Sequence, residues 1–380
     1  TRIAPDHEMD LSDESLIQDE PVFISITNRG YIKRVSDQAY RRQGRGGRGV
    51  IGQSMRGEDE VSFFVRANTL ETILFFTDKG KVYSGRVFEL PEESRQGRGI
   101  PLVNIINLEP EETVTAVLAV SDFKQAKYCA MVTRLGRVKR VPLSEFERVR
   151  PSGLIAIRLS GKDELGWVDV TSGHEDLILV THNGKALRFH EKEVRPTGRS
   201  TMGVTGIRLR GDDRVVSMDV VEPGGYLLVI TDKGQGKRTS LDEYLVKGRA
   251  TLGVTTISQE AHAEIGDIVE ACVVQEDEDI TLITRSGIVL RTKVSDISIQ
   301  GRATQGVHII DLDEGDSMAA IARISAKEAE ATQIEREAAL ADEQEFTQSF
   351  GPDTGTAVQE DESADDDGYS DEEGADISDE

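Results

Sequence analysis

Short apolar runs that each end in the same polar turn organise the chain. Six runs rich in β-branched and aromatic residues precede a Thr-x-x-Gly motif, and a second short run follows each motif. The motifs are Thr27/Gly30, Thr77/Gly80, Thr133/Gly136, Thr181/Gly184, Thr231/Gly234 and Thr284/Gly287. Two apolar runs around a glycine turn are typical of a β-hairpin, because glycine adopts the positive φ angles of tight turns. The pattern predicts six hairpins and almost no helix over residues 21–323.

The spacing of these hairpins indicates a structural repeat of about 50 residues. Successive turn glycines are separated by 50, 56, 48, 50 and 53 positions. One repeat of three or four short strands cannot bury both faces of its sheet alone, so neighbouring repeats must stack. Six copies favour a closed ring, since closure removes exposed sheet edges. We therefore expect an all-β fold, a six-bladed β-pinwheel or propeller. The expected blades lie near 21–70, 71–125, 126–174, 175–224, 225–278 and 279–323.

A second glycine and two sets of arginines recur in phase with the turns. The second glycine is followed by Val, Ile or Leu in every copy. Turn formation can account for the glycines, but core packing does not require a cation at one phase of every repeat. The second glycines are Gly49, Gly99, Gly153, Gly203, Gly253 and Gly306. The arginines that follow the turn glycine are Arg34, Arg140, Arg188, Arg238 and Arg291, with Ser84 at this place in the second repeat. The arginines near the second glycine are Arg45, Arg95, Arg98, Arg148, Arg150, Arg199, Arg249 and Arg302.

The densest positive charge lies in the first repeat, at residues 41–49. This stretch holds four arginines and four glycines: Arg41, Arg42, Gln43, Gly44, Arg45, Gly46, Gly47, Arg48 and Gly49. Such a loop has little side-chain bulk and many free backbone N–H groups, which suits a polyanion lying against the main chain. Together with the in-phase arginines it predicts a rim that contacts phosphates rather than base edges.

Charge divides the chain into a neutral body and two acidic flanks. Residues 21–323 carry 42 acidic and 42 basic residues, whereas residues 324–380 carry 20 acidic and 2 basic ones. A neutral body can still bind nucleic acid if its cations gather on one face. We interpret 1–20 as an acidic linker from a missing N-terminal region, because the chain begins with Thr1. We expect a possible helix at 324–345 and a disordered acidic tail at 346–380. That tail acts either as a solvated segment or as a competitor for the basic rim.

Several functional classes find no support in the residues. No run of about 18 apolar residues or signal peptide is present, so we expect no membrane partner. Cys129 and Cys272 lie in apolar runs and are expected to be buried free thiols, with a disulfide or metal site as the lesser alternative. We find no catalytic constellation and no phosphate-binding Gly-x-x-x-x-Gly-Lys-Ser/Thr motif, and we expect no metal site or cofactor in this chain. The histidines are scattered, and His182 and His190 are expected at the surface.

The segment 43–49 resembles a known sequence signature, the gyrase A box, whose usual form is Gln-(Arg/Lys)-Arg-Gly-Gly-(Arg/Lys)-Gly. The preceding residues 27–34 resemble the first blade of the same domain, and the six in-phase repeats resemble its remaining blades. The chain is thus similar over 21–323 to the C-terminal domain of the DNA gyrase A family. Gly44 departs from the usual Arg or Lys, and Arg41 and Arg42 are the neighbours that could restore the charge.

The resemblance implies a six-bladed β-pinwheel in which adjacent blades exchange strands. It implies that the domain wraps duplex DNA with a positive crossover, so that a type II topoisomerase introduces negative supercoils using ATP. The implied partners are duplex DNA, the gyrase B subunit, plus the rest of the A subunit, in an A2B2 complex in the cytoplasm on the nucleoid. Mg and ATP would bind elsewhere in the holoenzyme. The alternatives are the C-terminal domain of the topoisomerase IV A subunit, a protein-interaction propeller without a nucleic-acid role and, least supported, a propeller hydrolase.

Overall fold

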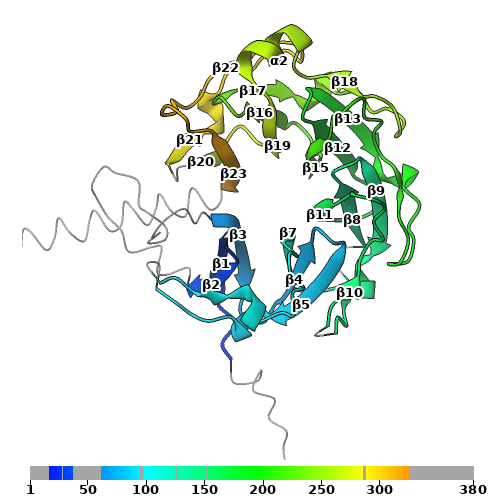
Figure 1. Cartoon of the computed structure of the whole chain (residues 1–380), viewed down its shortest axis with the longest axis vertical. Coiled ribbons are helices and arrows are strands. Elements are labelled where there is room, and N and C mark those ends of the chain that lie inside the picture. The colour runs from blue at the N-terminus through cyan, green and yellow to red at the C-terminus, as the bar shows by residue number, and fades with distance from the viewer. Residues whose placement is uncertain are drawn as a thin grey trace, which may run out of the picture.

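The computed structural model describes residues 17–324 except 28, 37–60, 95–96, 125–126, 151 and 286–287. Over these residues the strands form six antiparallel sheets, five of four strands and one of three, arranged in succession around a central axis (Figure 1). The all-β propeller or pinwheel prediction is confirmed. The stretch 41–49, Arg95 and the acidic flanks 1–16 and 325–380 lie outside the described residues.

Each sheet is built on one of the predicted hairpins. The hairpin strands are β1 (Pro21–Thr27) and β2 (Tyr31–Ser36), β4 (Thr72–Thr77) and β5 (Lys81–Arg86), β8 (Tyr128–Thr133) and β9 (Arg137–Pro142), β12 (Asp176–Thr181) and β13 (Lys185–His190), β16 (Tyr226–Thr231) and β17 (Gln235–Ser240), and β20 (Asp279–Thr284) and β21 (Val289–Lys293). The motif residues explain the turn. Gly184 adopts φ 78°, and its N–H donates to the carbonyl of Thr181, while Thr181 Oγ1 accepts from the N–H of Lys185 at 3.2 Å. Both Thr and Gly are therefore required by the backbone of the turn.

A third strand from later in the same repeat pairs with the first hairpin strand and faces the axis. These innermost strands are β3 (Val61–Asn68), β7 (Val114–Val120), β11 (Leu165–Thr171), β15 (Val215–Val220), β19 (Ile268–Val274) and β23 (Met318–Ile324). The register of each pair shifts at the Thr of the hairpin turn, for example between Val180 and Thr181 against β15. Consecutive inner strands pack against one another around the axis, as β15 does against β19.

The outermost strand of each four-stranded sheet comes from the following repeat. These two-residue strands are β6 (Ile100–Pro101), β10 (Leu154–Ile155), β14 (Val204–Thr205), β18 (Val254–Thr255) and β22 (Val307–His308). Each begins directly after a second glycine of the repeat and pairs with the second hairpin strand of the preceding sheet. The three-stranded last sheet has no such partner among the described residues, and the in-phase positions 50–51 lie outside them.

The hydrophobic core lies between consecutive sheets, because each of the four middle sheets packs both faces against its neighbours. One cluster joins Ile178 and Val180 of β12 to Leu227 and Val229 of β16. Cys129 and Cys272 are both buried and free, and burial raises the pKa of each thiol well above its ordinary value. Strands buried on both faces read as continuous apolar runs, which is the pattern seen in the sequence.

Helix is confined to short segments that connect the strands. Single 3₁₀ turns follow most hairpins, at η2 (Val87–Glu89), η4 (Leu143–Phe146), η5 (Glu191–Glu193), η6 (Leu241–Glu243) and η7 (Val294–Asp296), and η3 (Leu102–Asn104) follows β6. The α-helix α2 (Gln259–Ile265) lies on the outer side of the ring between β18 and β19, a position where the sequence pattern indicated none. Across the described part of the chain no helix is long and apolar enough to span a membrane.

Candidate nucleic-acid interface

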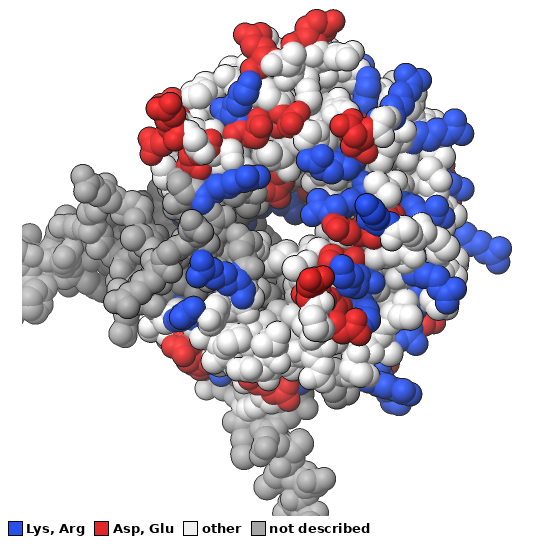
Figure 2. All heavy atoms as spheres, viewed as in Figure 1, with Lys and Arg blue, Asp and Glu red and all other residues white. Residues whose placement is uncertain are grey.

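The outer edge of the ring is formed by loops that run from each 3₁₀ turn to an exchanged strand. We call these segments the rim loops: 195–203, 245–253 and 298–306 in the last three repeats. Each leaves one sheet and ends on the preceding one, so it spans the junction between two blades. Figure 2 shows Lys and Arg along the right-hand outer edge of the ring, where Figure 1 places β9 and β13, and Asp and Glu at the top near α2.

Buried lysines form hydrogen bonds with the main chain of two of these loops and with the carbonyls of Ser94 and Gly97. Lys237 Nζ donates to the carbonyl oxygens of Gly301, Arg302 and Thr304 at 2.6–3.0 Å and to Thr304 Oγ1 at 3.1 Å. Lys139 Nζ bonds the carbonyls of Arg199 and Thr201 in the same manner, and Lys33 Nζ those of Ser94 and Gly97. Burial lowers the pKa of both Lys139 and Lys237 to about 8. These ammonium groups therefore order the rim backbone and do not face solvent.

The in-phase arginines of the rim loops pair with glutamates of the preceding blade. Arg199 Nε donates to Glu145 Oε2 at 3.1 Å, and the backbone N–H of Arg302 donates to Glu243 Oε2 at 3.1 Å. Arg249 has an equivalent arrangement, because its N–H donates to Glu193 Oε2 and its Nη1 to the carbonyl of Thr205 at 2.9 Å. These guanidinium groups stay partly exposed, with 32% and 36% of the side chain accessible in Arg199 and Arg302.

The arginines that follow the turn glycine have a different role from the one predicted. Arg140 is 4% exposed, and it donates to Glu191 Oε2 at 2.7 Å and to the carbonyl of Val194 at 2.8 Å. Arg238 is equally buried and donates to the carbonyl of Ile297 at 2.7 Å and to Glu276. Each guanidinium thus ties one blade to the loop of the next and has no free face for a phosphate. We therefore remove Arg140 and Arg238 from the predicted interface.

The other members of this set are also engaged within the protein. Arg34 is bonded to the carbonyl of Leu90 and to Glu92. Arg188 is bonded to Asp176 and to the carbonyl of Leu241. Arg291 pairs with Asp279 at 2.7 Å but keeps 42% of its side chain exposed. Arg98, which belongs to the arginines near the second glycine, stacks over Tyr31, 4.2 Å from the ring centroid, and its Nη2 donates to the Tyr31 hydroxyl.

Exposed cations that form no ion pair within the described residues lie in the rim loops or in the segments next to the second glycines. Arg148 and Arg150 were predicted and are exposed. Reasoning from the sequence missed Arg158 and Arg208, which stand five places after a second glycine, and also Arg195 and Lys247; all four are exposed. The N–H groups of Arg158 and Arg208 donate to the carbonyls of Thr201 and Thr251, which places both arginines beside the rim loops. For Arg158 and Arg208, the signal available in the sequence was their common distance of five places from the second glycine.

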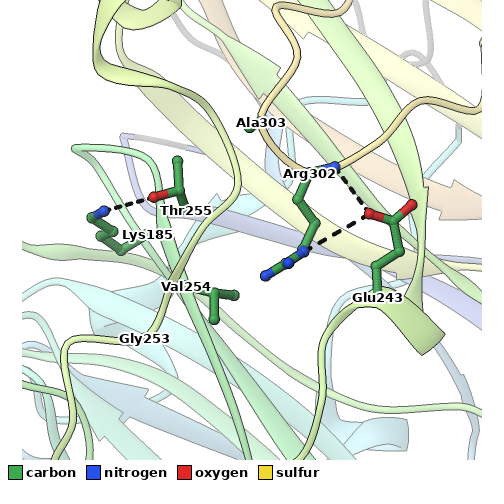
Figure 3. A pocket seen from close by; sticks show the side chains of 7 residues that line it. All are labelled: Lys185, Glu243, Gly253, Val254, Thr255, Arg302 and Ala303. Atoms are coloured by element: carbon green, nitrogen blue, oxygen red, sulfur yellow. Dashed lines mark hydrogen bonds and ion pairs between the residues drawn. The ribbon is translucent and has the colours of Figure 1, made fainter.

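A pocket of about 410 Å³ opens between two rim loops. It is lined by Lys185, Glu243, Gly253, Val254, Thr255, Arg302 and Ala303. Figure 3 shows the guanidinium of Arg302 pointing into it from one wall, with Lys185 on the opposite wall. Lys185 Nζ donates to Thr255 Oγ1 at 2.8 Å, and Glu243 partly neutralises Arg302 at 3.8 Å. Two cations and a hydroxyl around an open pocket form a site that can accept a phosphate oxygen.

The fold and this edge define a class, that of propellers built from hairpin repeats with exchanged outer strands and a cationic rim. A family model described as the DNA gyrase C-terminal domain, beta-propeller, matches six segments of the chain. The matched residues are 22–68, 71–121, 127–172, 175–222, 225–265 and 278–325. The chain belongs to this family.

Curated relatives agree with this assignment. The chain is 48% identical over 330 residues to the DNA gyrase A subunit of Halalkalibacterium halodurans, covering 87% of the chain and 39% of the relative. It is 41% identical over 325 residues to the DNA gyrase A subunit of Mycolicibacterium smegmatis, covering 85% of the chain and 38% of the relative. The chain thus spans about two fifths of the length of these relatives.

Two solved structures have the same fold. The C-terminal domain of DNA topoisomerase IV matches with a TM-score of 0.69 and 29% identity, covering 87% of this chain and 99% of that one. The DNA gyrase A C-terminal domain matches with a TM-score of 0.68 and 27% identity, covering 80% of this chain and 100% of that one. Structural similarity alone does not separate the two kinds of domain, whereas the curated relatives described above both come from gyrase.

Proposed function

We propose that the chain binds duplex DNA along its rim and wraps it with positive chirality, so that a type II topoisomerase introduces negative supercoils using ATP. The observation that supports this most directly is the series of exposed cations on the edges of consecutive blades. Arg148, Arg150, Arg158, Arg195 and Arg208 follow one another around the third and fourth repeats. Because the blades follow one another around a ring, a duplex that continues along this rim from blade to blade would have to bend.

The proposed contacts are with phosphates and not with base edges. Exposed Arg and Lys side chains supply charge, and the pocket containing Lys185 and Arg302 supplies a recessed phosphate site. Bending a site of 20–30 base pairs costs on the order of 1–6 kcal/mol, and the phosphate interactions that form along the curve offset that cost. Because each retained phosphate contact releases counterions, the affinity should fall steeply with salt.

The proposal extends to the assembly in which the chain works. The chain would act as the C-terminal part of the gyrase A subunit, in an A2B2 complex with the gyrase B subunit on the nucleoid in the cytoplasm. Strand cleavage, Mg and ATP would be handled elsewhere in that complex. The segment 41–49, with Gly44 in place of the usual cation, would complete the DNA path in a ring of six blades. The acidic segment 346–380 would compete with DNA for the rim.

The experiment that tests wrapping reads DNA topology. Nicked circular DNA is incubated with increasing amounts of the chain and sealed with ligase, and the linking number is then read on a gel. We expect a positive shift that grows with protein. The Arg158→Ala/Arg208→Ala variant should reduce the shift, and its salt dependence of binding should be shallower by about two units of slope, since each lost phosphate contact removes about 0.9.

The matched control removes two exposed lysines that follow the innermost strand β7. Lys124→Ala/Lys127→Ala loses the same charge from the segment between β7 and β8, outside the rim loops, and should leave the linking shift unchanged. Binding without a linking shift would assign the chain to a holding or bending role, closer to the topoisomerase IV domain that it resembles in structure. Absence of salt-sensitive binding would contradict a nucleic-acid role and favour a protein-interaction propeller.

A further inference from the structure

Two histidines and one aspartate from different blades converge beside α2. His182 lies in the turn between β12 and β13, His262 lies on α2, and Asp267 precedes β19. One ligand atom from each side chain lies within 4.8 Å of the other two. His182 Nε2 is 3.2 Å from Asp267 Oδ2, and His262 Nε2 is 3.2 Å from Asp267 Oδ1. The two histidines are 80 residues apart, so no local motif indicated this cluster.

The backbone around the three side chains is fixed from both blades. The Ser258 hydroxyl caps α2 by accepting from the N–H of Ala261 at 3.1 Å, and Ala261 and Ile265 are buried in the core between the fourth and fifth sheets. The Asp267 N–H donates to Asp232 Oδ1 at 3.1 Å, while the Asp232 N–H donates to the Asp267 carbonyl. The His182 N–H donates to the carbonyl of Arg214 and the His182 carbonyl accepts from the N–H of Ile268, so hydrogen bonds from both blades hold the cluster.

The two histidine side chains are mostly buried, which differs from the expectation that His182 lies at the surface, and Asp267 is more open. The exposed fractions are 17% for His182 and 20% for His262, and 45% for Asp267. The ring centroids of the histidines are 6.3 Å apart at 66°, so the rings do not stack. The two Nε2 atoms lie against different oxygens of the same carboxylate, so the three side chains meet at one place.

The two N···O separations suit the ligand spacing of a metal centre. With metal–ligand bonds of about 2.0–2.1 Å, adjacent ligand atoms are about 3.3 Å apart, close to both observed N···O separations. Metal-bound histidine usually has its second ring nitrogen in a hydrogen bond that fixes the ring. His182 Nδ1 has this partner in Asn183 Oδ1, at 3.2 Å. The carbonyl of His182, 3.0 Å from His262 Nε2, or water would complete the coordination.

We propose that His182, His262 and Asp267 bind one divalent transition-metal ion, and that this ion is zinc. Imidazole and carboxylate ligands suit zinc and do not suit Mg²⁺ or Ca²⁺, which prefer sets of oxygen ligands. The ion would join the hairpin of the fourth blade to the segment that returns from β18 to β19 in the fifth. It would thereby lock the blade junction across which the rim loop 245–253 passes.

The test is zinc binding to the metal-stripped full chain, measured by titration calorimetry and by the visible absorption of cobalt as a spectroscopic substitute. We expect one tight equivalent, the absorption bands of tetrahedral cobalt, and a thermal midpoint that rises with zinc concentration. His262→Gln and Asp267→Asn should each weaken binding by more than about 100-fold. Asn183→Ala, which alters only the orientation of His182, should weaken it by about 10-fold.

The control variant is His308→Gln. It removes another histidine paired with an aspartate, at 2.7 Å from Asp311, and no third ligand is grouped with that pair in the described part of the chain. This variant should still bind one equivalent of zinc tightly. Far-ultraviolet circular dichroism of His262→Gln separates loss of the ligand from loss of the fold. A tight equivalent that persists in His262→Gln, or no cobalt spectrum in the native chain, would overturn the proposal and leave Asp267 as a simple ion-pair bridge.

Discussion

The lysine at the third position after the turn glycine stabilises the rim from inside the protein. Lys33, Lys139 and Lys237 are each at most 1% exposed, yet their ammonium groups bond main-chain carbonyls of the following repeat. The same position holds Leu187 in the fourth repeat, so an apolar side chain can occupy it. A buried ammonium is tolerated in these blades because several carbonyl oxygens compensate for its lost hydration.

We expect Lys237→Leu to destabilise the fifth blade and to loosen the loop 298–306. The substitution removes four hydrogen bonds and leaves the carbonyls of Gly301, Arg302 and Thr304 without their donor. Loss of one partner from a buried polar group costs about 1–3 kcal/mol. Urea unfolding measures the loss, and hydrogen exchange should become faster at residues 300–305.

Lys233→Leu is the matched control for this substitution, because Lys233 is an exposed residue of the same hairpin. It should change the unfolding free energy by less than about 0.5 kcal/mol. Equal effects of the two substitutions, or unchanged exchange in the loop, would contradict the structural role of Lys237.

The arginines show where reasoning from the sequence reached its limit at the residue scale. The recurrence of a cation at one phase predicted a role beyond core packing, but two different roles share that recurrence. Arg140 and Arg238 lie on strands whose two faces are both covered by other blades, so their guanidinium groups reach carbonyls and carboxylates inside the fold. Arg158 and Arg208 lie outside the strands and are exposed. Only the packing of the blades distinguishes these cases.

At the scale of elements, the exchanged strand is the feature that joins the repeats. The hairpins were predictable because alternate apolar runs and Thr-x-x-Gly turns are local signals. The exchanged strands β10, β14 and β18 have two residues each, too few for any periodicity, and their partners lie in another repeat. Helix α2 was missed for a related reason, because a seven-residue helix offers only two buried positions, Ala261 and Ile265.

Gly253→Ala should weaken the exchange of β18 onto the fourth sheet. Gly253 has φ 72°, and a Cβ atom there would collide with the carbonyl oxygen of Ala186 in β13. Left-handed backbone and this contact together should cost about 1–3 kcal/mol. Denaturant unfolding tests the stability, and DNA affinity should fall because Arg249 is carried by the same loop.

Gly248→Ala provides the comparison within that loop. A Cβ atom at Gly248 would meet only Glu193 Oε2, at 3.8 Å, and the position has no left-handed φ. This variant should retain the stability and DNA binding of the native chain. A Gly253→Ala variant as stable as Gly248→Ala would show that the exchanged strand tolerates displacement from Ala186.

At the scale of the whole molecule, the innermost strands lie around the axis (Figure 1), and several of them carry a buried acidic residue. Asp169 on β11, Asp219 on β15 and Glu270 on β19 occupy consecutive inner strands, and Arg323 on β23 lies 3.9 Å from Asp219. Burial raises the pKa of Asp169 to about 6 and of Glu270 to about 7, and the charge of Asp219 adds to both shifts. Glu222 and Glu278 contribute further negative charge near Arg323.

These shifts predict that the ring becomes less stable as the pH rises through neutrality. The ordinary pKa values are 3.8 for Asp and 4.5 for Glu, so between those values and about 7 the folded state binds more protons than the unfolded state. Stability therefore falls with rising pH in this window. One pKa unit corresponds to about 1.4 kcal/mol, and one kcal/mol to about 2–4 °C in the thermal midpoint. We expect the midpoint to drop by several degrees between pH 6 and pH 8.

Glu270→Gln isolates this contribution from the other titrating groups of the chain. A neutral amide keeps an oxygen that can accept the hydrogen bond from the Ile321 N–H and has no charge to bury. The variant should therefore be more stable than the native chain at pH 8, and its midpoint should depend less on pH. Glu264→Gln, at an exposed position on α2, should keep the native pH dependence. If the thermal midpoint of Glu270→Gln depended on pH in the same way as that of the native chain, the charge of Glu270 would be in contact with water. Glu270 would then not be a source of the loss of stability at high pH.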